Sequence, residues 1–134
     1  MKIVVDTNIL FSFFWKDSHT KKLLINTKSE LISSEFALEE IKKYSKEIIT
    51  KAKISEDSFN EELKKLKLII NFINKNEYLD FIKDAEKISP DKKDAEFLAL
   101  ALKMNCPLWS NDSILKNQNK VRVLSTEDLI ETLF

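Results

Sequence analysis

Glycine is the most conspicuous absence, because the 134-residue chain contains none at all. Walker-type phosphate loops and dinucleotide-binding turns both need glycine, since only a residue without a Cβ atom lets the backbone approach a phosphate closely. Neither motif can therefore be present. The sequence offers no support for an ATP-driven or NAD-dependent activity.

Cysteine, histidine and arginine are also scarce, with one of each: Cys106, His19 and Arg122. A single cysteine cannot form an intrachain disulfide, and a Cys106–His19 nucleophilic pair has no local signature to support it. We expect Cys106 to behave as a small apolar residue and His19 as a surface side chain. Because nearly all cations are lysines, contacts with nucleic acid would favour the backbone over the bases.

Long apolar runs are missing as well, since no window approaches the 18 residues that a membrane span needs. We expect no membrane association and a cytoplasmic location. Lys plus Arg and Asp plus Glu are balanced at 22 each, so no global field attracts nucleic acid. Any such contact must rely on local lysines, for which the candidates are Lys42, Lys43, Lys92, Lys93 and Lys116.

Short apolar runs alternate with helical patterns along the chain. The predicted strands are Lys2–Val5, Glu30–Ser33, Pro107–Trp109 and Val121–Leu124. The predicted helices are Ile9–Trp15, Thr20–Ile25, Glu35–Ile48, Ser55–Asn74, Glu77–Ile88, Asp91–Met104 and Thr126–Leu133, with Leu68–Ile73 as an alternative strand. This alternation is typical of a three-layer α/β/α sandwich with a central, mainly parallel sheet. We expect one domain over residues 1–134.

Several local signals define these boundaries. Asn8 and Thr126 are expected to cap helices, and Ser89 followed by Pro90 is the usual start of one. The helix over 35–48 is expected to direct an apolar stripe into the core, consisting of Phe36, Ala37, Ile41, Tyr44 and Ile48.

Four acidic residues, each beside an apolar run, are the main candidates for function: Asp6, Glu40, Asp94 and Asp112. Asp6 and Asp112 follow predicted strands, and functional groups of parallel sheets gather at the carboxyl ends of strands. A pocket of carboxylates without a cation is costly unless a hard divalent metal fills it. The residue types therefore point to Mg²⁺ or Mn²⁺.

Five neighbouring residues could support these acids by orienting them or by holding water: Thr7, Asn8, Asp91, Ser110 and Asn111. For most of them a purely structural role, as a helix cap or in an Asx-type turn, is the alternative. Glu40 is preferred over Glu39 because it lies beside the apolar stripe, whereas Glu39 points about 100° away on a helix.

These acidic segments resemble the PIN-domain family of nucleases, related to the N-terminal domain of PilT-type proteins. The matching stretches follow the family's order along the whole chain: IVVDTNIL, ISSEFALEEI, SPDKKDAEFLALALKMNCPLWSNDSIL and VRVLSTEDLI. The resemblance implies that Asp6, Glu40, Asp94 and Asp112 are the metal-binding acids and that Ser110 takes the place of the usual Thr or Ser. Asn105 and Asn111 stand where the family usually has glycine, and asparagine tolerates left-handed backbone.

The resemblance further implies a Mg²⁺- or Mn²⁺-dependent endoribonuclease, either a VapC-like toxin of a toxin–antitoxin pair or an RNA-processing nuclease. One or two metal ions on Asp6, Asp94 and Asp112 would activate a water that Glu40 hydrogen-bonds. The expected partners are RNA, a protein antitoxin and a second copy of the chain. Exposed apolar residues at Phe11, Phe14, Trp15 and Phe134 also suggest the homodimer. Two alternatives remain, namely a phosphatase with Asp6 as nucleophile and a non-catalytic binding module with an acidic pocket.

Overall fold

A five-stranded, all-parallel sheet forms the centre of the computed structural model, which describes residues 1–133. The strands are β1 (Lys2–Val5), β2 (Glu30–Ser34), β3 (Ile70–Ile73), β4 (Leu108–Trp109) and β5 (Val123–Leu124). Their spatial order is β3-β2-β1-β4-β5, with every neighbouring pair parallel. Ile3, Val4 and Val5 of the central strand are fully buried, as a strand covered on both faces requires.

Helices cover both faces of this sheet. They are α1 (Thr7–Phe11), α2 (His19–Asn26), α3 (Glu35–Lys43), α4 (Ser45–Ala52), α5 (Glu56–Ile69), α6 (Ile82–Ile88), α7 (Ala95–Met104) and α8 (Thr126–Leu133). Short 3₁₀ turns join them: η1 (Ser12–Phe14), η2 (Lys75–Glu77), η3 (Leu79–Phe81), η4 (Lys92–Asp94) and η5 (Ser113–Lys116).

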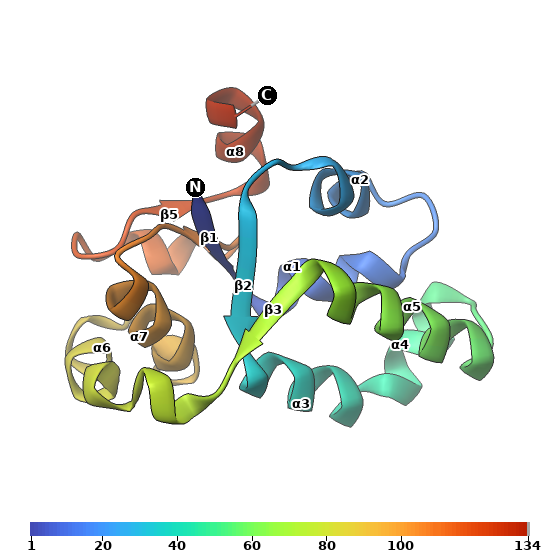
Figure 1. The fold of residues 1–134 in the computed structure, drawn as a ribbon, viewed down its shortest axis with the longest axis horizontal. Helices are drawn as coiled ribbons and strands as arrows, with labels where there is room; N and C mark the ends of the chain where they lie inside the picture. The colour runs from blue at the N-terminus through green and yellow to red at the C-terminus, as the bar shows by residue number, and fades with distance from the viewer. Residues whose placement is uncertain (134) are drawn as a thin grey trace.

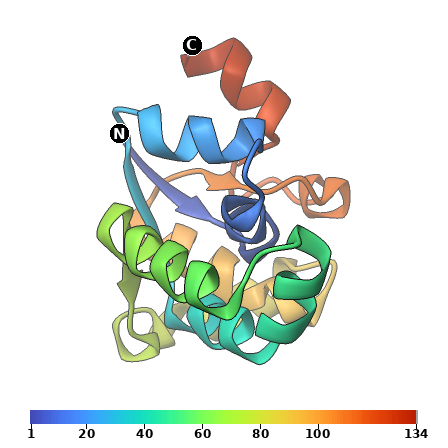
Figure 2. The same cartoon turned by 90° about the vertical axis from the view of Figure 1, so that its right-hand side faces the viewer.

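The two faces of the sheet are covered by different helices. On one side α7 packs against β1, β2 and β4, with α6 outside it, while α1, α2 and α5 lie on the other side (Figure 1). Six of the ten residues in α7 are buried, which matches its apolar sequence. Figure 2 shows α8 beyond α2, at the end of the molecule where the chain begins. The predicted three-layer α/β architecture is confirmed, and the sheet is parallel throughout.

Several predicted element boundaries were wrong. The helix expected over 35–48 is broken at Tyr44, and the helix expected over Ser55–Asn74 ends at Ile69. Ile70–Ile73 then continues as β3, inside the alternative strand predicted over Leu68–Ile73, because its backbone pairs with β2. The helix expected from Asp91 starts as an α-helix only at Ala95.

The caps predicted at Asn8, Ser89 and Thr126 were also wrong. The first helix begins at Thr7 after Asp6, so Asn8 lies inside it. Asp91, and not Ser89, begins η4 and accepts a hydrogen bond from the Lys93 amide. At α8 the cap is Ser125, the residue before Thr126.

The capping interactions of Ser125 are reciprocal. Its hydroxyl accepts the Asp128 amide hydrogen bond, and Asp128 accepts the Ser125 amide in return. Asn105 ends α7 in left-handed backbone with φ 49°, as its substitution for glycine predicts. Asn111 does not share this geometry, because the positive-φ residues in the described chain are Lys53 and Asn105. No described helix combines the length and the apolar character needed to cross a membrane.

Candidate active site

The carboxyl ends of β1 and β4 bring the first two candidate residues together. The Asp6 amide donates to the Trp109 carbonyl at 3.0 Å, which aligns the two strand ends. Directly beyond them the Ser110 hydroxyl donates to Asp6 Oδ2 at 2.7 Å. Asp6 is 3% exposed and Ser110 is 1% exposed, so this is a buried contact between residues 104 positions apart.

Asp112 joins the same strand end through Ser110. Its amide donates to the Ser110 hydroxyl at 3.1 Å, so one serine contacts both acids. Asp112 Oδ1 accepts the Ile114 amide at 3.1 Å and thereby begins η5. One carboxylate oxygen is therefore used locally, and the half-buried side chain still keeps a second oxygen for a ligand.

Glu40 reaches the site from α3 by a contact with Thr7. The Thr7 hydroxyl donates to Glu40 Oε1 at 2.7 Å, and Thr7 itself is buried at 4% exposure. Glu40 is half-buried, whereas Glu39 is exposed. The rotation of α3 therefore turns the residue preferred from the sequence toward Asp6.

Asp94 approaches from the start of α7, where it is half-buried and makes no side-chain capping bond. Burial is the main reason that its pKa rises from 3.8 to about 7, and the charges of Asp6, Asp91, Asp112 and Glu40 raise it further. Such coupling requires these acids to lie within electrostatic reach of one another. Asp91 is exposed and contributes only its charge to this group.

The pKa of Asp6 is also raised, again mainly by burial, although hydrogen bonds from Ser110 and from the Thr7 backbone oppose the shift. The charges of Glu40 and Asp112 raise it further. Both shifts have the same physical origin, since several carboxylates share a partly desolvated space. Within residues 1–133, none of the four acids forms an ion pair with a lysine or arginine.

The four acids offer a set of ligands that can be compared with the needs of a divalent cation. The donors are all hard carboxylate oxygens, and their mutual repulsion is the condition that a divalent cation relieves. However, in the described part of the chain no three acidic, histidine or cysteine side chains are close enough to form a ready-made metal cluster. The donor set therefore fits Mg²⁺ or Mn²⁺, while binding would have to draw the side chains closer together.

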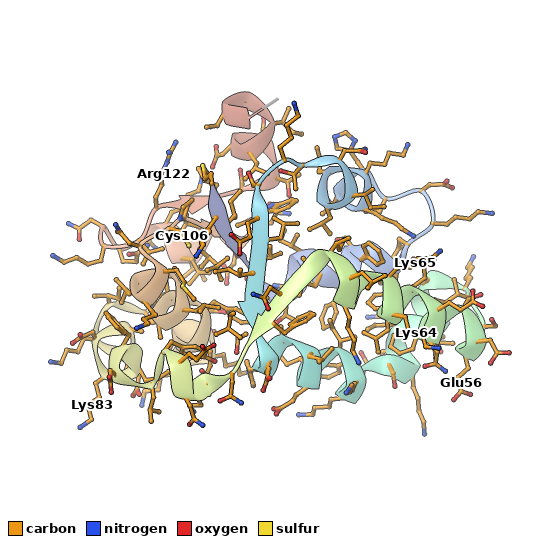
Figure 3. The ribbon with its side chains drawn as sticks, viewed as in Figure 1. Glu56, Lys64, Lys65, Lys83, Cys106 and Arg122 are labelled. Carbon is orange, nitrogen blue, oxygen red and sulfur yellow. The ribbon has the colours of Figure 1, made fainter. Side chains whose placement is uncertain are left out.

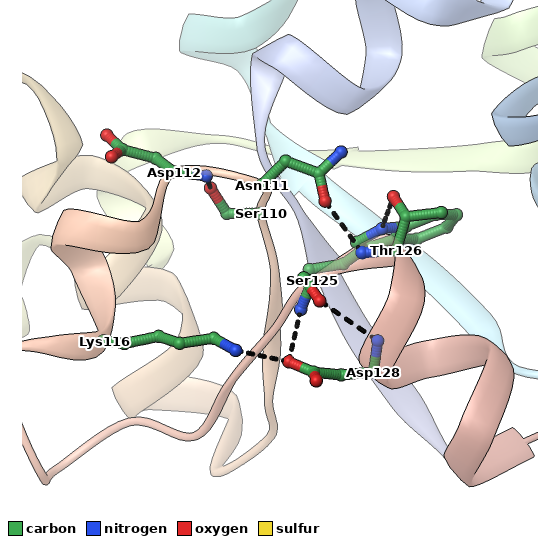
Figure 4. A network of polar contacts seen from close by, with 8 residues as sticks. Ser110, Asn111, Asp112, Lys116, Ser125, Thr126 and Asp128 are labelled. Carbon is green, nitrogen blue, oxygen red and sulfur yellow. Dashed lines mark hydrogen bonds and ion pairs between the residues drawn. The ribbon is translucent and has the colours of Figure 1, made fainter.

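One predicted supporting residue turns away from the acids, and a second is exposed to solvent. Asn111 is exposed, and its Oδ1 accepts the Thr126 amide at 2.7 Å, so it holds α8 to the sheet (Figure 4). Asn8 is exposed on α1. Lys116 pairs with Asp128 in the same network, which makes it a poor candidate for contacting RNA (Figure 4).

An open pocket of about 380 Å³ adjoins the acids and contains Glu40 in its wall. The remaining lining residues are Phe36, Glu39, Lys43, Tyr44 and Lys93. Two of the predicted lysines, Lys43 and Lys93, thus lie beside the acidic group. Tyr44 was assigned to the core from its helical spacing, but it is 37% exposed because the helix breaks there.

The alternative Cys106–His19 pair finds no support. Cys106 precedes β4 and so lies at the amino ends of the strands (Figure 3), whereas Asp6 follows the carboxyl end of β1. Burial raises the pKa of its thiol, which disfavours the nucleophilic thiolate. His19 is exposed at the start of α2, as expected.

Comparisons with known proteins identify the family of the chain and a solved structure with a similar fold. The family model of the PIN domain matches residues 4–130. Among solved structures, the chain resembles VapBC2 from Rickettsia felis, crystallised with a DNA fragment from the promoter. That match has a TM-score of 0.64 at 17% identity and covers 93% of this chain and 98% of the other. No curated protein matches the sequence.

Proposed function

The chain belongs to the PIN domain family, and we propose that it is a Mg²⁺- or Mn²⁺-dependent endoribonuclease. The observation that carries this proposal is the group formed by Asp6, Glu40, Asp94 and Asp112. Among residues 1–133 this group has no cationic partner, and the pKa of Asp94 is raised to about 7. Family membership supports a nuclease in general. The choice of RNA as substrate belongs to the proposal.

In this mechanism Asp6, Asp94 and Asp112 would hold the metal. When bound, the metal supplies Lewis acidity, which makes water more acidic and stabilises negative charge on phosphate oxygens. Glu40 is oriented by Thr7 through Oε1, and its second oxygen would accept a hydrogen bond from the attacking water. Ser110 keeps Asp6 in place and favours its charged form.

A phosphatase that uses Asp6 as nucleophile is a weaker proposal. Asp6 is almost completely buried, and one of its oxygens already accepts the Ser110 hydroxyl. A nucleophile needs an oxygen that can reach a phosphorus atom in line. A non-catalytic binding module with the same acidic pocket is separated from the nuclease by measuring cleavage.

We further propose that the protein is the toxin of a toxin–antitoxin pair, with an RNA-processing nuclease as the alternative. The likeness to the VapBC2 structure supports this proposal at the level of the fold. A homodimer and a protein antitoxin are the proposed assemblies. Phe14, expected to help form an exposed dimer surface, is instead part of the core at 2% exposure. Phe134 lies outside the described residues.

Cleavage of single-stranded RNA by purified protein tests the nuclease. We expect cleavage with Mg²⁺ or Mn²⁺ and none with EDTA. Glu40→Gln should lower kcat by roughly 100-fold or more, since it removes a proton acceptor. Glu61→Gln is the matched control, because this carboxylate is exposed on α5, away from the acids, and should leave kcat unchanged. Full activity in EDTA, or equal losses in the two variants, would contradict the proposal.

A further inference from the structure

Three pockets adjoin one another along α1, α3 and α4, and aromatic side chains join them. The pocket beside Glu40 shares Tyr44 with a second pocket of about 200 Å³, which is lined by Phe11, Trp15, Tyr44, Glu47, Ile48 and Lys51. This pocket in turn shares Trp15 with a third of about 500 Å³, lined by Ser12, Trp15, Lys16, Asp17, Ser18 and Ala52. We call this series the aromatic track.

The two joining rings are positioned by other elements. Tyr44 lies at the break between α3 and α4, and the edge-on ring of Phe11 supports it at 6.3 Å between ring centroids. Trp15 is half-buried at the end of η1. Each ring is therefore held by the fold while part of its surface stays open to the pockets. Such rings are the usual platforms on which unpaired bases stack.

Charge along the aromatic track is mixed. Four lysines and three carboxylates line it besides Glu40, namely Lys16, Lys43, Lys51, Lys93, Asp17, Glu39 and Glu47. The Lys43 ammonium lies 5.5 Å from the Tyr44 ring centroid, so a base on this ring would bring its phosphate near a cation. Because the charges nearly cancel, stacking must supply much of the affinity for a polyanion.

From this arrangement we propose that single-stranded RNA runs from the acidic group across Tyr44 to Trp15, with a base stacked on each ring and with Lys43 and Lys93 contacting the phosphates nearest Glu40. The proposal rests on the proposed nuclease function, because Glu40 forms the wall of the first pocket. Paired bases hide their faces in the helical stack, so the track selects unpaired strands. Tyr44 and Trp15 thereby become substrate-binding residues.

RNA binding to the full chain in EDTA tests the track without requiring metal or cleavage. The probe is an oligouridylate of about eight nucleotides, compared with one of about two. We expect Tyr44→Ala to weaken binding of the longer strand by roughly 5- to 150-fold, and Tyr44→Phe to bind like wild type because stacking needs the ring and not the hydroxyl. Leu68→Ala is the control, since Leu68 is 87% exposed on α5, outside the track.

Tryptophan fluorescence locates the strand independently. The chain has two tryptophans, and Trp109 is fully buried, so quenching by RNA should come from Trp15. In Trp15→Phe the quenching should disappear while binding persists, because phenylalanine can also stack. Circular dichroism of each variant verifies that it is folded.

The possible results distinguish failure of the aromatic track from failure of the proposed nuclease function. Unchanged RNA affinity in folded Tyr44→Ala, or quenching that survives in Trp15→Phe, would overturn the track; unchanged affinity is also the result expected if the groove holds a protein partner instead of RNA. Absence of RNA binding by wild type would overturn it too. Binding with the expected variant effects, but without metal-dependent cleavage, would support the track and reject the nuclease function.

Discussion

Replacing Asp94 by asparagine should stabilise the metal-free protein, and the gain should depend on pH. Asp94 is half-buried among other carboxylates, and its pKa rises from 3.8 to about 7, first because of burial and then because of the neighbouring charges. The side chain makes no capping bond at the start of α7, so asparagine removes the charge without removing a helix cap.

The sign follows from proton linkage. Between pH 4 and 7 the folded protein binds the Asp94 proton more strongly than the unfolded chain does. The stabilising effect of that proton is fully present below the unfolded pKa of 3.8 and is lost as pH rises through about 7. The charged carboxylate therefore destabilises the wild type most at alkaline pH.

The size of this effect can be bounded. At about 1.4 kcal/mol per pKa unit, the full shift of roughly three units sets a ceiling near 4 kcal/mol. Water in the open pocket screens part of the repulsion. The neighbouring acids also share the bound proton, so the full shift does not belong to Asp94 alone. We therefore expect a net gain of roughly 1–2 kcal/mol at pH 8, which raises Tm by about 5 °C.

Thermal denaturation followed by circular dichroism, in EDTA and at low salt, measures this gain. Asp94→Asn should melt clearly above wild type at pH 8 and close to it at pH 5. The control is Glu39→Gln, because Glu39 is exposed and should show no such pH dependence. Mn²⁺ at about a hundredfold excess over its dissociation constant should stabilise wild type by about 2.7 kcal/mol, and Asp94→Asn much less.

Two results would refute this reasoning. If Asp94→Asn melted at or below wild type at pH 8, the acids would not repel one another in the folded protein. If Mn²⁺ stabilised the variant as much as wild type, Asp94 would not belong to the metal site. In that case the proposed nuclease would lose its chemical basis.

Other measurements address the rest of the site. Ser110→Ala should lower the free energy of unfolding by about 1–3 kcal/mol, because a fully buried hydroxyl that contacts both Asp6 and Asp112 is lost. It should also raise the pKa of Asp6 further and move the acid limb of the pH–rate profile upward; an unmoved profile would contradict the assigned role. Cys106→Ser and His19→Ala should leave cleavage near wild type, and a large loss in either would revive the nucleophilic pair. Light scattering at micromolar concentration should give the mass of a dimer, whereas a monomer mass would count against the proposed homodimer.

The sequence alone determined the order of most strands and helices, and it predicted the chemistry of the site. The run Ile3-Val4-Val5 predicted a strand buried on both faces, and Asp6 directly after it was expected to emerge at the carboxyl edge. The absence of glycine removed whole classes of phosphate-binding motif. Residue types at strand ends therefore predicted hard-cation chemistry before any contact was known.

Only the tertiary structure decided how the side chains are oriented. Glu40 faces the site because the Thr7 hydroxyl holds it, and Asn111 faces away because it holds the start of α8. Ile70–Ile73 suits a helix or a strand equally well by its pattern, and its pairing with β2 makes it a strand. The break at Tyr44 opens the pocket beside Glu40. Each of these outcomes depends on partners distant in sequence, which local periodicity cannot reveal.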